Sequence, residues 1–153
     1  MSLSDKRIWV DIEQPKTAVM FKSLITKFQE ENSKLFVTAR NYDSTFNILD
    51  DSHITYKKVG RHGGDKLEDK LETYIDRLNQ LFPLIKKFSP EYFVTFLSIE
   101  GTRIAYGLKI PSICINDEPR NKPVCKLIHP FAHLLLNMKN IYSFLLHNWI
   151  LSL

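Results

Sequence analysis

Cysteine is scarce in this sequence. Its two cysteines, Cys114 and Cys125, form neither a CxxC pair nor a cysteine–histidine spacing that would hold zinc. We therefore expect no disulfide framework, no metal site and a reducing compartment. Residues 1–8 also lack the apolar core of a signal peptide, so the cytoplasm is the expected location.

An excess of one charge is missing as well. The formal net charge is only +4, and lysines are interspersed with acidic residues, as in the segment 66–72. This pattern is typical of a solvated surface. Because no basic patch with interleaved aromatic residues is visible, we expect no nucleic-acid partner.

What remains is an ordinary globular composition, with 44% hydrophobic and 25% charged residues in a chain of 153. Disordered and collagen-like classes are excluded by these values. The length fits one domain, which can bury most of its apolar surface without disulfides or metals.

Short apolar runs alternate with helical patterns along the chain. Ile8, Trp9 and Val10 form a continuous apolar run, as in a central parallel strand that is buried on both faces. Further strands are predicted at 35–37, 55–59, 92–97 and 113–115. Helices are predicted at 16–32, from Asp43 or Ser44 to 49, from Leu67 to Ile85, and at 100–107.

The helix that begins at Leu67 is the longest. Pro83 lies inside its pattern, so we expect a kink or a break there. One apolar stripe is predicted to cover the sheet, formed by Leu67, Leu71, Tyr74, Ile75, Leu78, Leu81, Phe82 and Ile85.

Strands separated by helices imply βαβ units with right-handed crossovers. We predict a single Rossmann-like α/β domain of three layers, whose parallel sheet has five or six strands in the order 3-2-1-4-5-6. Leu134, Leu135 and Leu136 are either the sixth strand or the start of an apolar helix reaching Leu153.

The final residues of the chain are predicted to lie outside the domain. We expect a domain over 1–137 and an apolar tail over 138–153 that packs on the domain or on a partner, including a second copy of the chain. Lys139 and His147 interrupt a region about as long as the ~20 residues of a membrane span. Membrane insertion is therefore not expected.

Polar residues follow each predicted strand, at the edge where open parallel sheets hold ligands. They predict a binding cleft, although loops and helix caps are polar in any protein. The residues are Asp11 and Glu13 after the first strand, Arg40 after the second, Arg61, His62, Gly63 and Gly64 after the third, Ser98 and Glu100 after the fourth, and Asn116 and Asp117 after the fifth.

The loop 60–64 is the most suggestive of these clusters. Its glycines let backbone amides approach an anion, Arg61 can pair with a phosphate or carboxylate, and His62 can titrate near neutrality. The loop is neither a GxGxxG nor a Walker motif, and a tight turn with a surface histidine is the alternative. Equally, Glu100 can simply complement a helix dipole and Asp11 can have a structural role.

Several short motifs occur together in a recognisable order and spacing. They are Trp9–Glu13, Phe21-Lys22, Leu24-Ile25, Thr38–Arg40, His62–Gly64, Ile110–Ser112 and Asn116-Asp117. Over residues 6–137 the sequence resembles the archaeal and bacterial DUF354 family, and through it the amino-terminal half of GT-B proteins such as the UDP-GlcNAc 2-epimerases and the MurG-type glycosyltransferases. Thr17 stands where the family often has a histidine.

The resemblance implies the acceptor-side half of a sugar-nucleotide enzyme, of glycosyltransferase or epimerase type, that works with a second Rossmann half. A sugar nucleotide or a glycosyl acceptor would be the ligand, and no cofactor is required. His62, Glu13 and Asp11 are the candidate catalytic residues. The candidate ligand-binding residues are Arg40, Arg61, Gly63, Gly64, Ser98, Glu100, Asn116 and Asp117.

Two other functions stay open. The chain can be a binding or interaction module without catalysis that keeps only the fold. It can also be a complete small enzyme, which we rank last because a lone Rossmann domain leaves its cleft half open to water. The fold by itself does not decide between them.

Overall fold

The computed structural model describes residues 3–137, and the predicted tail 138–153 lies outside them. Six parallel strands form one sheet in the order β3-β2-β1-β4-β5-β6. The predicted strand order is confirmed, and Leu134–Leu136 belong to a strand. The bounds are β1 Arg7–Ile12, β2 Lys34–Asn41, β3 Lys57–Arg61, β4 Tyr92–Thr95, β5 Ser112–Asn116 and β6 Leu134–Asn137.

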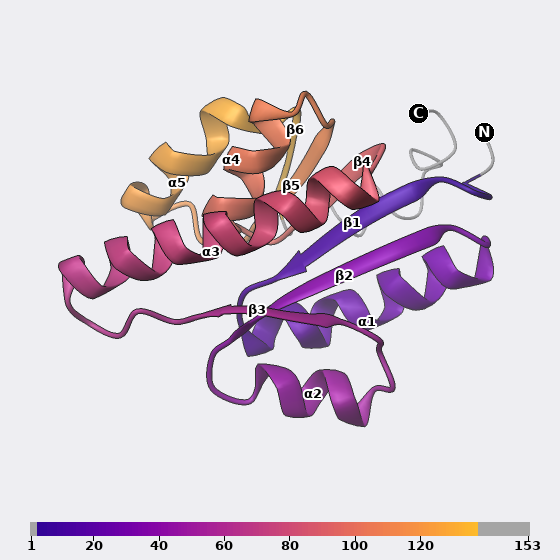
Figure 1. Cartoon of the computed structure of the whole chain (residues 1–153), viewed down its shortest axis with the longest axis horizontal. Coiled ribbons are helices and arrows are strands. Elements are labelled where there is room, and N and C mark those ends of the chain that lie inside the picture. Colours follow the sequence, from indigo (N-terminus) through magenta and orange to yellow (C-terminus); the bar gives the residue numbers. More distant parts are fainter. Residues whose placement is uncertain (1–2, 138–153) are drawn as a thin grey trace.

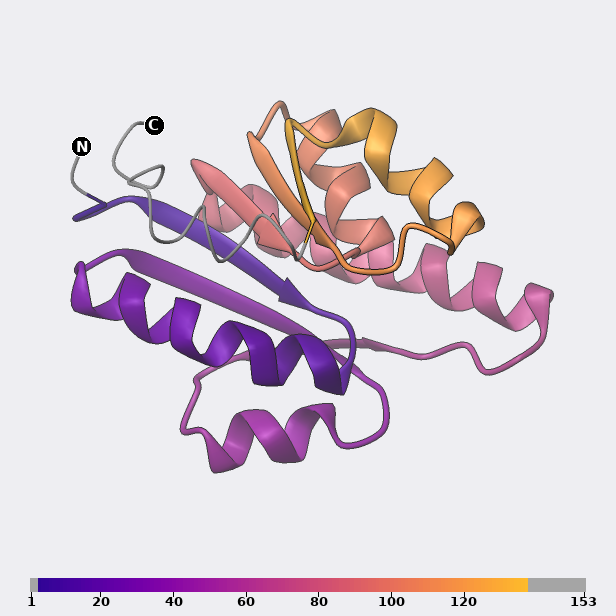
Figure 2. The ribbon, with the colours of Figure 1, turned by 180° about the vertical axis from the view of Figure 1, so that it is seen from behind.

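Helices cover both faces of the sheet, as Figures 1 and 2 show. Two lie on one face, α1 Pro15–Glu30 and α2 Thr45–Asp51. Three lie on the other, α3 Leu67–Phe88, α4 Ile99–Gly107 and α5 Lys122–Ile128, the last continued by the 3₁₀ turn η1 His129–Phe131. The predicted three-layer architecture is therefore confirmed.

The central strand β1 divides the core into two parts. Because strand side chains alternate in direction, Ile8, Val10 and Ile12 pack on the side of α1. Trp9 packs on the other side, with Leu81 and Ile85 of α3. The polar residue next in that alternation, Asp11, consequently points toward α3 from inside the sheet.

The predicted bounds of the third strand are wrong, and a break in the helix that follows is not found. β3 begins and ends later than expected, so Gly60 and Arg61 are strand residues rather than loop residues. Helix α3 does not break at Pro83 but continues to Phe88. Pro83 and Asn79, four residues before it, are both exposed, so water can satisfy the carbonyl that loses its helical partner.

The predicted stripe of α3 is only partly buried. The residues that face the sheet are Thr73, Arg77, Leu81 and Ile85. Four members of the predicted stripe are exposed instead, with 82% of Leu67, 60% of Leu71, 50% of Ile75 and 47% of Phe82 accessible. A second, outward-facing apolar surface therefore runs along this helix.

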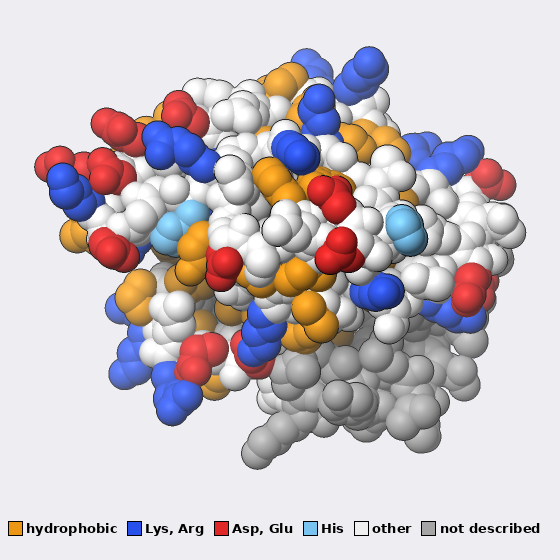
Figure 3. Space-filling model, turned by 90° about the horizontal axis from the view of Figure 1, so that it is seen from below, with side chains coloured by type: hydrophobic (Ala, Val, Ile, Leu, Met, Phe, Trp, Pro, Cys, Tyr) orange, Lys and Arg blue, Asp and Glu red, His pale blue; other side chains and the backbone are white. Residues whose placement is uncertain are grey.

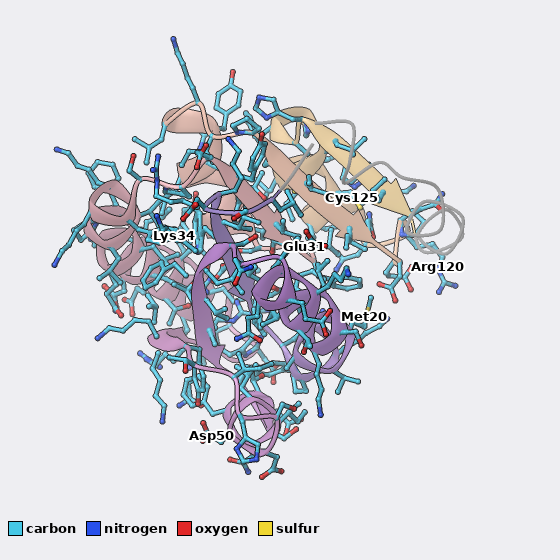
Figure 4. The ribbon with its side chains drawn as sticks, turned by 90° about the vertical axis from the view of Figure 1, so that its right-hand side faces the viewer. Met20, Glu31, Lys34, Asp50, Arg120 and Cys125 are labelled. Carbon is cyan, nitrogen blue, oxygen red and sulfur yellow. The ribbon has the colours of Figure 1, made fainter. Side chains whose placement is uncertain are left out.

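Figure 4 looks at the end where strands begin, with Lys34 at the start of β2 and Glu31 just after α1. On the face that Figure 3 shows, from the side of α1 and α2, charged side chains of both signs surround hydrophobic ones without forming a basic stripe. Within residues 3–137, no helix is long and apolar enough to span a bilayer.

Candidate functional site

The carboxyl end of the sheet gathers the predicted site residues into a continuous edge. Its centre is a buried ion cluster behind β1. Asp11 Oδ1 lies 2.7 Å from Arg77 Nη2, and Arg77 Nη1 lies 3.4 Å from Glu100 Oε2. The Asp11 and Arg77 side chains are fully buried. Two carboxylates thus flank one guanidinium, joining β1, α3 and α4.

Hydroxyl groups complete the hydrogen bonding of Asp11. Thr38 Oγ1 donates to Asp11 Oδ1 over 2.6 Å and accepts from Trp9 Nε1, while Ser98 Oγ donates to Asp11 Oδ2 over 2.5 Å. Ser98 also caps α4, because its Oγ accepts the Gly101 amide proton. These contacts fit the structural alternative for Asp11, Ser98 and Glu100, and their catalytic or ligand-binding roles stay predictions.

Arg77 was not predicted as a site residue, because the helix face was assigned from the spacing of apolar residues. The signal was there: Thr73, Arg77, Leu81 and Ile85 recur at four-residue spacing on one face. A buried arginine needs carboxylate partners. Burial by itself would lower the pKa of Arg77, but the charges of Asp11 and Glu100 raise it.

Glu13 has a carboxyl group that can exchange a proton near neutral pH. Burial, and next the charge of Asp11, raise its pKa to about 8. Thr17 Oγ1 donates to Glu13 Oε1 over 3.0 Å, whereas Glu13 Oε2 is buried without a hydrogen-bond partner among residues 3–137. At neutral pH the group is therefore mainly a neutral acid that can donate a proton or a hydrogen bond.

A row of side chains connects Glu13 to the loop after β3. Arg40 donates two hydrogen bonds, of 3.2 and 3.0 Å, to the Glu13 backbone carbonyl. The Arg40 guanidinium lies 5.9 Å from the centre of the Tyr42 ring, and that ring stacks on His62 at 4.2 Å. Tyr42 was not predicted; its position beside Arg40 at the end of β2 was the available signal.

His62 has a defined state in this row. Burial, helped by the charges of Arg40 and Lys70, lowers the pKa of His62, so the ring is neutral at pH 7. Its Nδ1 accepts the Gly64 amide proton over 3.0 Å, which leaves the ring proton on Nε2. The neighbouring groups thus select one tautomer.

The two loop glycines serve different purposes. A Cβ on Gly63 would lie 2.6 Å from the Lys70 Cα, so this position must be glycine for the loop to pack on α3. Gly64 has open space but a φ of +71°, a conformation that glycine adopts at little cost. Arg61 lies beside these residues and lines a hollow of about 260 Å³ with Asn41, Gly60, Thr73, Asp76 and Gln80.

The end of β5 forms the other side of the edge. Asn116 Nδ2 lies 2.9 Å from His129 Nε2 and 3.3 Å from Cys125 Sγ, and Asn116 Oδ1 accepts the Glu118 amide proton. Asp117 pairs with Lys16, the second residue of α1. The loops after β1 and β5 are therefore linked by charge. Lys16 was not predicted as a site residue.

No cluster of three or more potential metal ligands occurs among residues 3–137. The groups present at this edge are a neutral buried acid, a neutral histidine, and arginine and lysine cations around them. Such a set suits proton transfer to or from an oxygen and attraction of an anion such as phosphate.

Residues 6–147 match the family model described as "Protein of unknown function (DUF354)". A similar sequence is that of an uncharacterised protein of Methanocaldococcus jannaschii, 30% identical over 125 residues. That alignment covers 82% of this chain and 36% of the relative, so the chain spans about a third of the relative's length.

Solved structures share the fold at low sequence identity. A putative UDP-N-acetylglucosamine 2-epimerase from Listeria monocytogenes has a TM-score of 0.70 at 10% identity, over 88% of this chain and 39% of its own. The Neisseria meningitidis UDP-GlcNAc 2-epimerase, solved with UDP-GlcNAc, gives 0.66 at 13%, over 82% and 39%. MurG of Acinetobacter baumannii gives 0.67 at 14%, over 86% and 41%.

Proposed function

The chain belongs to the DUF354 family, described as proteins of unknown function, and from this premise we propose that it is the acceptor-side half of a GT-B-like sugar-nucleotide enzyme. The reaction would be of glycosyltransferase or epimerase type. A second Rossmann half, on the same polypeptide or on another, would close the cleft. The neighbours in fold support the architecture, since each extends well beyond the part that this chain matches.

The observation that carries the proposal is the state of Glu13. A carboxyl group with a pKa of about 8, whose Oε2 has no partner in the described part of the chain, lies just after the first strand, at the switch point of the sheet. Maintaining a buried, half-satisfied acid costs stability, and such groups cluster at functional sites. In this proposal Glu13 exchanges a proton with a sugar or acceptor hydroxyl.

The neighbouring groups take supporting roles. Neutral His62 is the second acid–base candidate, because its Nε2 carries the proton and its Nδ1 is held by the Gly64 amide. Arg61 is exposed beside its hollow and would meet a phosphate or carboxylate. Arg40 holds the loop that carries Glu13 in place.

One alternative has its own support. A non-catalytic interaction module is favoured by the apolar side chains exposed along α3, which no described residue covers. In this alternative the fold is the same, and the chain binds a partner instead of catalysing a reaction.

Calorimetric titration with UDP-GlcNAc and with UDP tests whether this edge binds a nucleotide sugar. We expect saturable binding that is lost in His62→Ala and Arg61→Ala, since both residues belong to the predicted edge. His53→Ala and Lys34→Ala are matched controls: His53 follows α2, and Lys34 lies at the opposite end of the sheet. Equal loss in the controls would contradict a binding site at this edge, and absence of binding at millimolar ligand would exclude a nucleotide-sugar site on this half alone.

A further inference from the structure

Helix α3 presents an apolar surface to solvent along most of its length. Leu67, Leu71, Ile75 and Phe82, which we call the α3 stripe, are between 47% and 82% exposed. Their spacing of four, four and seven residues places them on one side of a helix with 3.6 residues per turn. From Leu67 to Phe82 the stripe is ~22 Å long at ~1.5 Å per residue.

The two ends of the α3 stripe differ in shape. At its amino-terminal end Leu67 and Leu71 project from the helix, which extends here beyond the edge of the sheet (Figure 1). At its carboxyl-terminal end the surface is concave between α3 and α4. The hollow there measures about 350 Å³ and is lined by Leu78, Asn79, Phe82, Arg103, Ile104, Gly107 and Leu108.

The two ends also differ in charge. Glu68 and Glu72 follow the stripe residues of the first two turns, and Asp69 lies in the same segment. The last turn carries Lys86 and Lys87. A helix of this kind repels a parallel copy of itself and attracts an antiparallel one.

We propose that the α3 stripe is the interface of a homodimer in which α3 of a second copy packs antiparallel across it. Centring the pair between Ile75 and Leu78 brings Leu71 of one copy against Phe82 and the hollow of the other. The same register places Glu68 within one residue of the position opposite Lys86 of the second copy, and Glu72 about one and a half turns further along. Each contact occurs twice, as a two-fold axis requires.

This occupant is distinct from the second Rossmann half of the proposed function. That half would close on the carboxyl edge of the sheet, where α3 begins. The α3 stripe runs away from this edge as far as Phe82, near the other end of the helix. Antiparallel pairing also places the two candidate sites at opposite ends of the dimer, so both stay accessible.

Sedimentation velocity of the full chain tests the interface directly. We expect a dimer, and we expect Leu71→Glu and Phe82→Glu to weaken it at least tenfold, with unchanged helical content since both side chains are already exposed. Val19→Glu is the matched control, because Val19 is 61% exposed on α1. A monomeric wild type, or a dimer that survives both α3 variants, would overturn the proposal.

Charge reversal tests the antiparallel register and separates it from other modes of association. Glu68→Lys with Glu72→Lys should weaken self-association, and so should Lys86→Glu. Mixing these two variants should restore a dimer of one copy of each, because every reversed contact is then attractive again. Failure of the mixture to associate would overturn the antiparallel register, and a dimer insensitive to all these changes would show that another surface or the segment 138–153 joins the copies.

Discussion

At the scale of single residues, the surroundings of Glu13 change its acidity. Its carboxyl group is almost fully buried and shares its surroundings with Asp11, so the neutral form is favoured in the folded state. A glutamate with the usual pKa would be ionised at the neutral pH where Glu13 is still mainly protonated. The environment, and not the residue type, therefore sets its chemistry.

This state of Glu13 predicts a pH dependence of stability. The pKa is about 8 in the folded state against 4.5 without burial. The folded state therefore retains a proton that the unfolded chain has lost between these values. The resulting stabilisation is complete below pH 4.5 and is lost as pH rises to about 8, at up to ~1.4 kcal/mol per unit.

The glutamine variant measures this effect. Glu13→Gln is neutral at every pH, so its free energy of unfolding should fall less than that of the wild type between pH 5 and 8. Urea unfolding at several pH values gives the difference, with Glu30→Gln, an exposed residue of α1, as control. Parallel curves for wild type and Glu13→Gln would mean that Glu13 has the same charge folded and unfolded.

At the scale of elements, α4 depends on a glycine that lets it approach the sheet. A Cβ on Gly101 would lie 2.4 Å from Phe93 Cζ and 2.9 Å from Ser98 Oγ. Phe93 cannot move easily because it is fully buried against Trp9, with ring centroids 4.1 Å apart. The amino terminus of α4, and with it Glu100, is thus positioned by a glycine.

Two alanine substitutions in the same helix should have opposite effects. Gly101→Ala should destabilise by ~1–3 kcal/mol through overpacking. Gly107→Ala has open space and a helical conformation, so it should stabilise by ~0.5–1 kcal/mol. Denaturant midpoints of both variants check this. Equal effects of the two substitutions would contradict the close packing at Gly101.

At the scale of the whole molecule, the ion cluster of Asp11, Arg77 and Glu100 joins helices α3 and α4 to the central strand β1. The three residues come from β1, α3 and α4, which are far apart in sequence. A buried arginine between two carboxylates stabilises only while all partners are present. A change in any of these three residues should therefore alter both the candidate site and the stability of the fold.

Removing one partner tests this coupling. Arg77→Met should cost ~3–5 kcal/mol, because Asp11 and Glu100 would be left buried without a counter-ion. Adding Asp11→Asn and Glu100→Gln should recover much of that loss. Guanidinium unfolding measures both, with Arg103→Met on α4 as the surface control. No recovery in the triple variant would mean that packing of the arginine stem, rather than charge, is what matters.

The sequence by itself determined the architecture of this protein. Apolar runs such as Ile8–Val10 and the alternating helical patterns depend on local periodicity, so they predicted the strands and helices. The rules for βαβ units then gave the strand order and the three layers. The sequence also placed Glu13, Arg40, His62 and Asn116 at one edge, because parallel strands bring their carboxyl ends together.

Only the tertiary structure decided what these groups are. The face of α3 that is buried, with Arg77 inside and Leu67, Leu71 and Ile75 outside, depends on where Asp11 and Glu100 lie in space. The neutral state of Glu13 depends on burial, which sequence spacing does not contain. Both are non-local electrostatic outcomes, because desolvation and charge pairing act between residues that only the folded chain brings into contact.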